Sequence, residues 1–82
     1  MEVKITKETE TFARNNKMEI YPYGEGVVFI DYNRGIYGEE SLTAKVIAKL
    51  KKDNPSLMVT AVAAFITSIS SLGAIVNFEE KP

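Results

Sequence analysis

A stretch of 25 consecutive residues without a charged side chain, Asn54 to Phe78, constrains this chain more than any other feature. Most of these residues are apolar, so a folded chain must remove them from water. Hydroxyl residues and a glycine interrupt the stretch in its middle: Thr67, Ser68, Ser70, Ser71 and Gly73. Such a cluster between two apolar segments is typical of a turn.

The two halves of this stretch favour a β-hairpin. β-branched and aromatic residues are frequent in both halves, and these residue types suit a pleated surface. We therefore predict a first strand at Leu57–Thr67, a connection at Ser68–Gly73 and a second strand at Ala74–Glu80.

Two alternatives to the hairpin stay open. Asn54 as an N-cap, Pro55 in a first turn and Gly73 just past the end are the boundary signals of a buried helix. The stretch also exceeds the roughly 20 apolar residues that cross a bilayer, and lysines precede it, so residues 55–78 would allow a membrane anchor.

Composition excludes several classes of chemistry. The 82 residues have the length of one small domain, and the formal charge of −1 supplies no general attraction to nucleic acid. The chain contains neither cysteine nor histidine. Thiolate chemistry and imidazole proton transfer are therefore absent, and nothing is present to activate the serine hydroxyls. We find no catalytic, cofactor or metal motif, and we expect a protein that is not an enzyme.

Residues 1–17 and 18–33 predict a helix followed by a hairpin. The helix is expected from Thr6 to Asn15, ended by a left-handed residue at Asn15-Asn16, and an extended arm is the alternative. In the hairpin, Gly24-Glu25-Gly26 forms the turn. Pro22 has no backbone N–H, so its strand is expected at the edge of a sheet. The N-terminal residues lack the apolar core of a secretory signal, so we expect a cytoplasmic protein.

Residues 38–53 form the clearest predicted helix. Leu42, Val46, Ile47 and Leu50 share one face, and Asn54-Pro55 ends the helix because the residue before proline disfavours helical backbone. With residues 57–80 as the second hairpin, the order is α-β-β-α-β-β. This order predicts a single α+β domain in which helices pack on one face of a four-stranded, mostly antiparallel sheet.

Four tyrosines gather around the first hairpin: Tyr21, Tyr23, Tyr32 and Tyr37. Tyrosine is common in cores, at sheet edges and at protein interfaces, and exposed aromatic rings also stack nucleic-acid bases. The surrounding segment is acidic, and Arg34 is its one basic residue between Met18 and Thr43. These acidic residues would repel the phosphate backbone of a nucleic acid, so they disfavour nucleic-acid binding. We therefore treat the tyrosines as a candidate protein interface.

A stripe of lysines provides a second candidate surface. Lys45, Lys49 and Lys52 recur on one face of the predicted helix, where they would contact an acidic partner or phosphate. A solvated helix face is the simpler interpretation of the same pattern.

Self-association is expected because both faces of the predicted strands are apolar. Helices cover one face, and the other would expose a large apolar patch. We predict a homodimer or a larger closed oligomer through the sheet face around Val28, Ile30, Val62 and Ile66, without fixing which alternate residues face outward. We also expect Val62 to be buried, so that Val62→Asp would unfold the domain.

The functional hypothesis is a small binding or regulatory protein that contacts another protein through a sheet edge or the tyrosine-rich hairpin. One alternative is a nucleic-acid-binding module that uses the tyrosines and the lysine stripe. The other is a small membrane-anchored protein.

Overall fold

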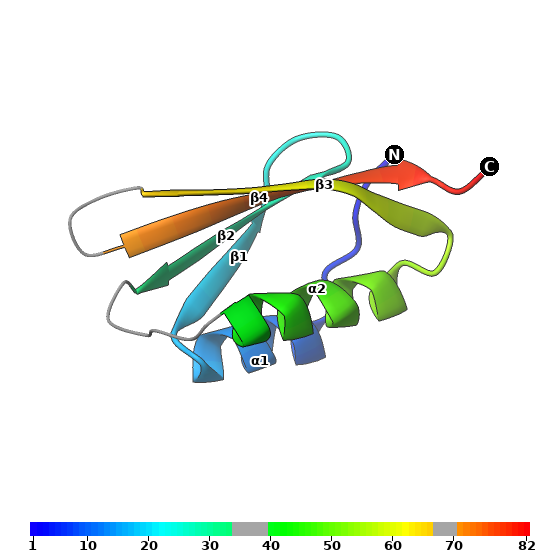
Figure 1. Cartoon of the computed structure of the whole chain (residues 1–82). Coiled ribbons are helices and arrows are strands. Elements are labelled where there is room, and N and C mark those ends of the chain that lie inside the picture. The colour runs from blue at the N-terminus through cyan, green and yellow to red at the C-terminus, as the bar shows by residue number, and fades with distance from the viewer. Residues whose placement is uncertain (34–39, 67–70) are drawn as a thin grey trace.

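Two helices and four strands follow one another in the predicted order. The computed structural model describes residues 1–33, 40–66 and 71–82. The four strands form one antiparallel sheet with the spatial order β1-β2-β4-β3, and both helices lie on the same side of it (Figure 1). The predicted α+β fold class is confirmed. The elements are α1 (Lys7–Asn15), β1 (Met18–Pro22), β2 (Val27–Asn33), α2 (Glu40–Asp53), β3 (Leu57–Ile66) and β4 (Ser71–Glu80).

The long uncharged stretch forms the antiparallel β3–β4 pair, so the helical alternative is wrong. Strand β4 begins at Ser71, three residues before the predicted start, because β2 is long enough to pair Asn33 with Ser71. Gly73 therefore lies within the strand instead of in the connection. Within the described ranges, no helix is long and apolar enough to cross a membrane.

Local signals position α1 as predicted, with one correction at its end. Thr6 is the N-cap, and its Oγ1 accepts a hydrogen bond from the Thr9 amide at 3.3 Å. The left-handed residue after the helix is Lys17, with φ of 60°, and not Asn15 or Asn16. Asn16 instead uses its side-chain amide, which donates to the Phe12 carbonyl at 2.8 Å.

The turn between β1 and β2 requires glycine at Gly26. This residue has φ of +70°, and a Cβ there would lie 2.8 Å from the carbonyl oxygen of Phe78. The close approach brings the hairpin against β4, where the Phe78 amide donates to the Gly26 carbonyl at 2.7 Å. Strand β1 lies at the sheet edge, as Pro22 predicted.

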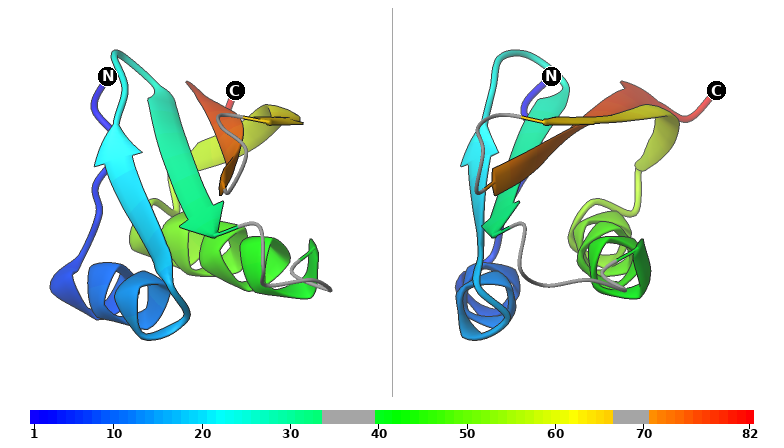
Figure 2. Two further views of the ribbon diagram at one scale, coloured as in Figure 1. Left: turned by 90° about the vertical axis from the view of Figure 1, so that its left-hand side faces the viewer. Right: turned by 60° about the vertical axis from the view of Figure 1, so that its left-hand side comes forward.

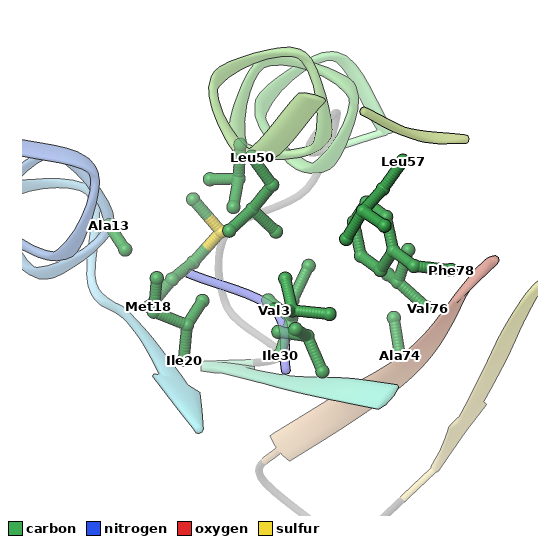
Figure 3. Close-up of a cluster of buried hydrophobic side chains, with 12 residues drawn as sticks. Val3, Ala13, Met18, Ile20, Ile30, Leu50, Leu57, Ala74, Val76 and Phe78 are labelled. Carbon is green, nitrogen blue, oxygen red and sulfur yellow. The ribbon is translucent and has the colours of Figure 1, made fainter. Parts of the chain in front are cut away.

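The hydrophobic core lies between the sheet and the helices (Figure 3). Val46 and Leu50 of α2 are fully buried, and Ala13 supplies the contact from α1. Strands β1, β2 and β4 contribute alternate residues to the core, and Leu57 extends it to the start of β3. The buried apolar residues are Val3, Ala13, Met18, Ile20, Val28, Ile30, Val46, Leu50, Leu57, Ala74, Val76 and Phe78.

A polar cluster fastens the N-terminal segment to the end of α2. The buried side chain of Asn54 accepts a hydrogen bond from the Lys4 amide at 2.7 Å. It also donates to the carbonyls of Lys4 and Leu50, both at 2.8 Å. Beside it, Asp53 Oδ2 accepts from Thr9 Oγ1 at 2.6 Å. These contacts join segments about fifty residues apart in the chain. They also give hydrogen-bond partners to backbone groups that would otherwise be buried without one.

The expected burial of Val62 is wrong. Val62 pairs in register with the fully buried Val76, but its own exposed fraction is 50%. Val62 lies on the edge strand β3, in the segment Ala61–Ala64 that is exposed, whereas Leu57 at the start of the same strand is buried in the core. A charged side chain at this half-exposed position stays in contact with water, so Val62→Asp is expected to leave the domain folded.

Leu50→Ala is expected to lower the free energy of unfolding by about 2 to 4 kcal/mol, because it leaves a cavity between α2 and the sheet. Lys49→Ala, one position away on a partly exposed side, is expected to cost less than about 1 kcal/mol. Urea unfolding of the two variants tests the orientation of α2, and equal losses would contradict it.

Candidate protein-binding face

Both described helices lie on one side of the sheet (Figure 2), so the alternate strand residues that point away from them form the other side. We call this the open face. The register places Tyr21, Phe29, Ile75 and Ala63 in one row across the four strands. Because neighbouring positions in a register row point to the same side, this row forms a continuous apolar band from one sheet edge to the other.

Three aromatic rings form the centre of the open face. Phe29 lies between two tyrosines, with ring centroids 6.3 Å from Tyr21 and 5.6 Å from Tyr23. The Tyr23 amide donates to the Val27 carbonyl at 2.8 Å, which holds this residue beside β2 although it follows the end of β1. Tyr21 and Tyr23 are 43% and 63% exposed. Rigid, exposed aromatic rings of this kind are common anchors of protein interfaces.

The charged residues that share the open face are all acidic. Glu19 and Asp31 lie directly opposite each other on β1 and β2, and Glu79 lies on β4. Oδ1 of Asp31 is inaccessible to solvent and has no hydrogen-bond partner within the described part of the chain. No lysine or arginine occupies a described strand position on this face. The face therefore combines an apolar band with a rim of carboxylates, while Arg14 of α1 lines a hollow beside Glu19 and Tyr21 at the β1 edge.

Tyr21 is held in place by its acidic neighbour. Its hydroxyl donates a hydrogen bond to the Glu19 carboxylate. This bond, with a smaller contribution from desolvation, raises the pKa of the Tyr21 phenol, which therefore stays protonated at neutral pH. The ring keeps one orientation while its apolar faces stay available.

The structure separates the four sequence-predicted tyrosines. Tyr21 and Tyr23 lie on the open face, and Tyr32 pairs in register with Met18 and Leu72. Tyr37 lies outside the described residues. Two residues that the sequence analysis did not single out complete the site: Phe29 and Ile75. Their alternation with Val28 and Val76 was visible, but it did not reveal which set faces outward.

The four residues predicted for a self-association face are also separated. Val28 and Ile30 are fully buried against the helix layer, so they are not available on the surface of the subunit. Val62 is exposed, but it shares the helix-facing side of the sheet with Val76. Ile66 pairs in register with Leu72 at the end of β3.

The three lysines predicted to form a stripe on α2 have different surroundings in the structure. The Nζ atom of Lys49 lies 4.8 Å from the centroid of the Phe12 ring, so this lysine joins α2 to α1 by a cation–π contact. Lys45 and Lys52 are exposed to solvent. Two separate ammonium groups on a solvated helix face are the ordinary arrangement for a soluble domain.

Searches against protein-family models, curated proteins and solved structures find no match to this chain. In the described ranges, no group of three acidic residues is placed to hold a metal ion.

Proposed function

We propose that this protein is a binding module that recognises another protein through the open face. The observation that carries the proposal is the combination of exposed aromatic rings and carboxylates, without a lysine or arginine at any described strand position, on the side of the sheet away from the described helices. The complementary partner surface is an apolar patch bordered by lysine or arginine side chains.

The chemistry of the face supports this partner class. Guanidinium and ammonium groups bind favourably over tyrosine rings and beside carboxylates such as the exposed Glu19 and Glu79. Glu19, Asp31 and Glu79 would instead repel the phosphates of a nucleic acid. An aromatic centre with a charged rim also matches the usual anatomy of a protein interface.

Selection from a display library of short random peptides tests the partner class. The peptides that bind are expected to be rich in arginine or lysine next to apolar residues. Tyr21→Lys is expected to reduce binding of the selected peptides at least tenfold, because it removes an anchor ring and adds a repelling charge, a loss of roughly 1.4 kcal/mol or more. Fluorescence anisotropy with labelled peptides measures this change.

A matched charge change elsewhere controls for altered net charge. Ala48→Lys at an exposed position of α2 adds the same single positive charge as Tyr21→Lys, and it is expected to leave peptide binding unchanged. Selection of acidic peptides, or equal losses in Tyr21→Lys and Ala48→Lys, would reject the proposed site.

A further inference from the structure

In the part of the chain that the structure describes, no strand pairs with the outer edge of β3. This strand ends the sheet, its ten residues carry no charge, and its residues from Ala61 to Ala64 are exposed on both faces. Proteins usually protect such an edge with a charge, a proline, a bulge or a covering segment. The one irregularity of β3 lies between Val59 and Ala61, so the regular part from Ala61 to Ile66 has no charge, proline or bulge.

The hydrogen bonds of the sheet show which backbone groups of β3 point outward. Phe78 donates to Gly26, so its backbone groups point toward β2. Backbone direction alternates along a strand, and Ile75 and Asn77 therefore point toward β3, where they pair with Ala63 and Ala61. It follows that the N–H and C=O groups of Val62 and Ala64 point away from the sheet.

We propose that a second copy of this chain pairs with β3 in antiparallel orientation and extends the sheet to eight strands. In the register centred on Ala63, Val62 of each copy lies opposite Ala64 of the other copy. Each of these two pairs exchanges two N–H···O=C bonds, so the four outward-pointing N–H groups and the four carbonyls of Val62 and Ala64 in the two copies are satisfied. This interface is distinct from the open face and uses no residue of its aromatic cluster.

A second copy fits this edge better than an arbitrary strand for two reasons. The exposed segment Ala61–Ala64 has no charge and only small side chains, so nothing in it repels a second copy of itself. Antiparallel pairing of identical strands also has the two-fold symmetry that most homodimers adopt. The half-exposed side chain of Val62 would also gain a neighbour, because Ala64 of the second copy would lie beside it on the helix side.

The opposite edge of the sheet explains why assembly stops at two copies. By the same alternation, the Tyr23–Val27 bond directs Tyr21 toward β2 and Pro22 outward, where Pro22 has no N–H to offer. Residues 2–5 also run beside this edge and line a hollow with Ile20 and Pro22. These features leave β1 poorly suited to pairing with a further β3, and the two-fold contact uses the β3 edge of both copies, so the proposed assembly is a closed dimer.

Sedimentation equilibrium across a range of micromolar concentrations tests the dimer. The mass is expected to rise from the chain mass of 9.1 kDa to twice that value, with the modest affinity typical of a small interface. Hydrogen exchange should show Val62 and Ala64 amides that become protected as the concentration rises. A chain that stays at 9.1 kDa throughout, or forms species larger than a dimer, would overturn the proposal.

Removing one outward N–H distinguishes edge pairing from any other contact. Ala64→Pro is expected to raise the dissociation constant of the dimer at least tenfold, whereas Ala64→Ser keeps the N–H and should dimerise like the original chain. Val62→Lys, which places a charge at an exposed position, provides the same test if the proline variant is unfolded. A dimer that survives Val62→Lys, or Ala64→Pro in a folded chain, would show that the edge is not the interface.

A single engineered cysteine checks the register. The chain has no cysteine of its own, so Ala63→Cys introduces the only thiol. In the proposed register the two copies of residue 63 form a non-hydrogen-bonded pair with Cα atoms about 4.5 Å apart, which suits a disulfide. Mild oxidation should give a covalent dimer, while Ala48→Cys on the exposed surface of α2 should not. Equal cross-linking of the two variants would reject the register.

Tyr21→Lys separates this proposal from the proposed function. It is expected to weaken peptide binding and to leave the dimer intact, whereas Val62→Lys is expected to do the reverse. Loss of the dimer in Tyr21→Lys would mean that the copies associate through the open face.

Discussion

Val76→Asp is expected to unfold the domain, whereas Val62→Asp is expected to leave it folded. The two valines lie directly opposite each other on β4 and β3, but Val76 is fully buried in the core and Val62 is half exposed at the sheet edge. A buried carboxylate without a partner costs several kcal/mol, which is comparable with the whole stability of a small domain. Far-ultraviolet circular dichroism and urea unfolding distinguish the two outcomes.

The pair is a strict test because both variants have the same chemistry and the same register row. If Val62→Asp unfolds as completely as Val76→Asp, then β3 is covered on its helix side, and the edge is not available to a second copy. A folded Val76→Asp would place the core elsewhere.

Asn54→Ala is expected to lower the free energy of unfolding by about 2 to 4 kcal/mol. The substitution removes three hydrogen bonds and leaves the partly buried N–H and C=O groups of Lys4 without their side-chain partner, while the Leu50 carbonyl keeps its bond from the backbone N–H of residue 54. It also removes the link between Lys4 and the end of α2, so hydrogen exchange of the segment around Lys4 should accelerate. Thermal unfolding measures the first effect and mass-resolved exchange the second.

Asn15→Ala is the matched control for this prediction. Asn15 is the same residue type at the exposed end of α1, and its replacement is expected to change stability by less than about 0.5 kcal/mol. Equal losses in the two variants would mean that Asn54 does not fasten the N-terminal segment.

The two proposed surfaces are compatible because they use different parts of the sheet. A two-fold axis perpendicular to the sheet relates antiparallel copies of β3, so the helices of both copies lie on one side and both open faces lie on the other. The proposed dimer would therefore present two aromatic clusters in one plane. A partner with two matching sites would bind such a dimer more tightly than a single module.

The order of elements and most of their positions were predictable from the sequence. Turn residues such as Gly24 and Gly26 separate the strands of the first hairpin, and Asn54-Pro55 ends α2 at the expected residue. These signals act over a few residues, so they do not depend on the rest of the chain. The β-branched residues of the uncharged stretch likewise indicated strands correctly.

Which side of each strand faces the helices was decided only by the tertiary structure. Val28 and Phe29, or Val62 and Ala63, are equally apolar neighbours, so periodicity does not distinguish inside from outside. The order of the strands in the sheet determines which of two paired residues is buried: β4 lies inside the sheet and β3 at its edge, although β3 comes first in the chain. Val76 on β4 is therefore part of the core, and Val62 on β3 is half exposed. The tyrosines were visible in the sequence, and the first hairpin brings them to Phe29 and Asp31, but the addition of Ile75 to this group requires the register between β2 and β4, which are far apart in the chain.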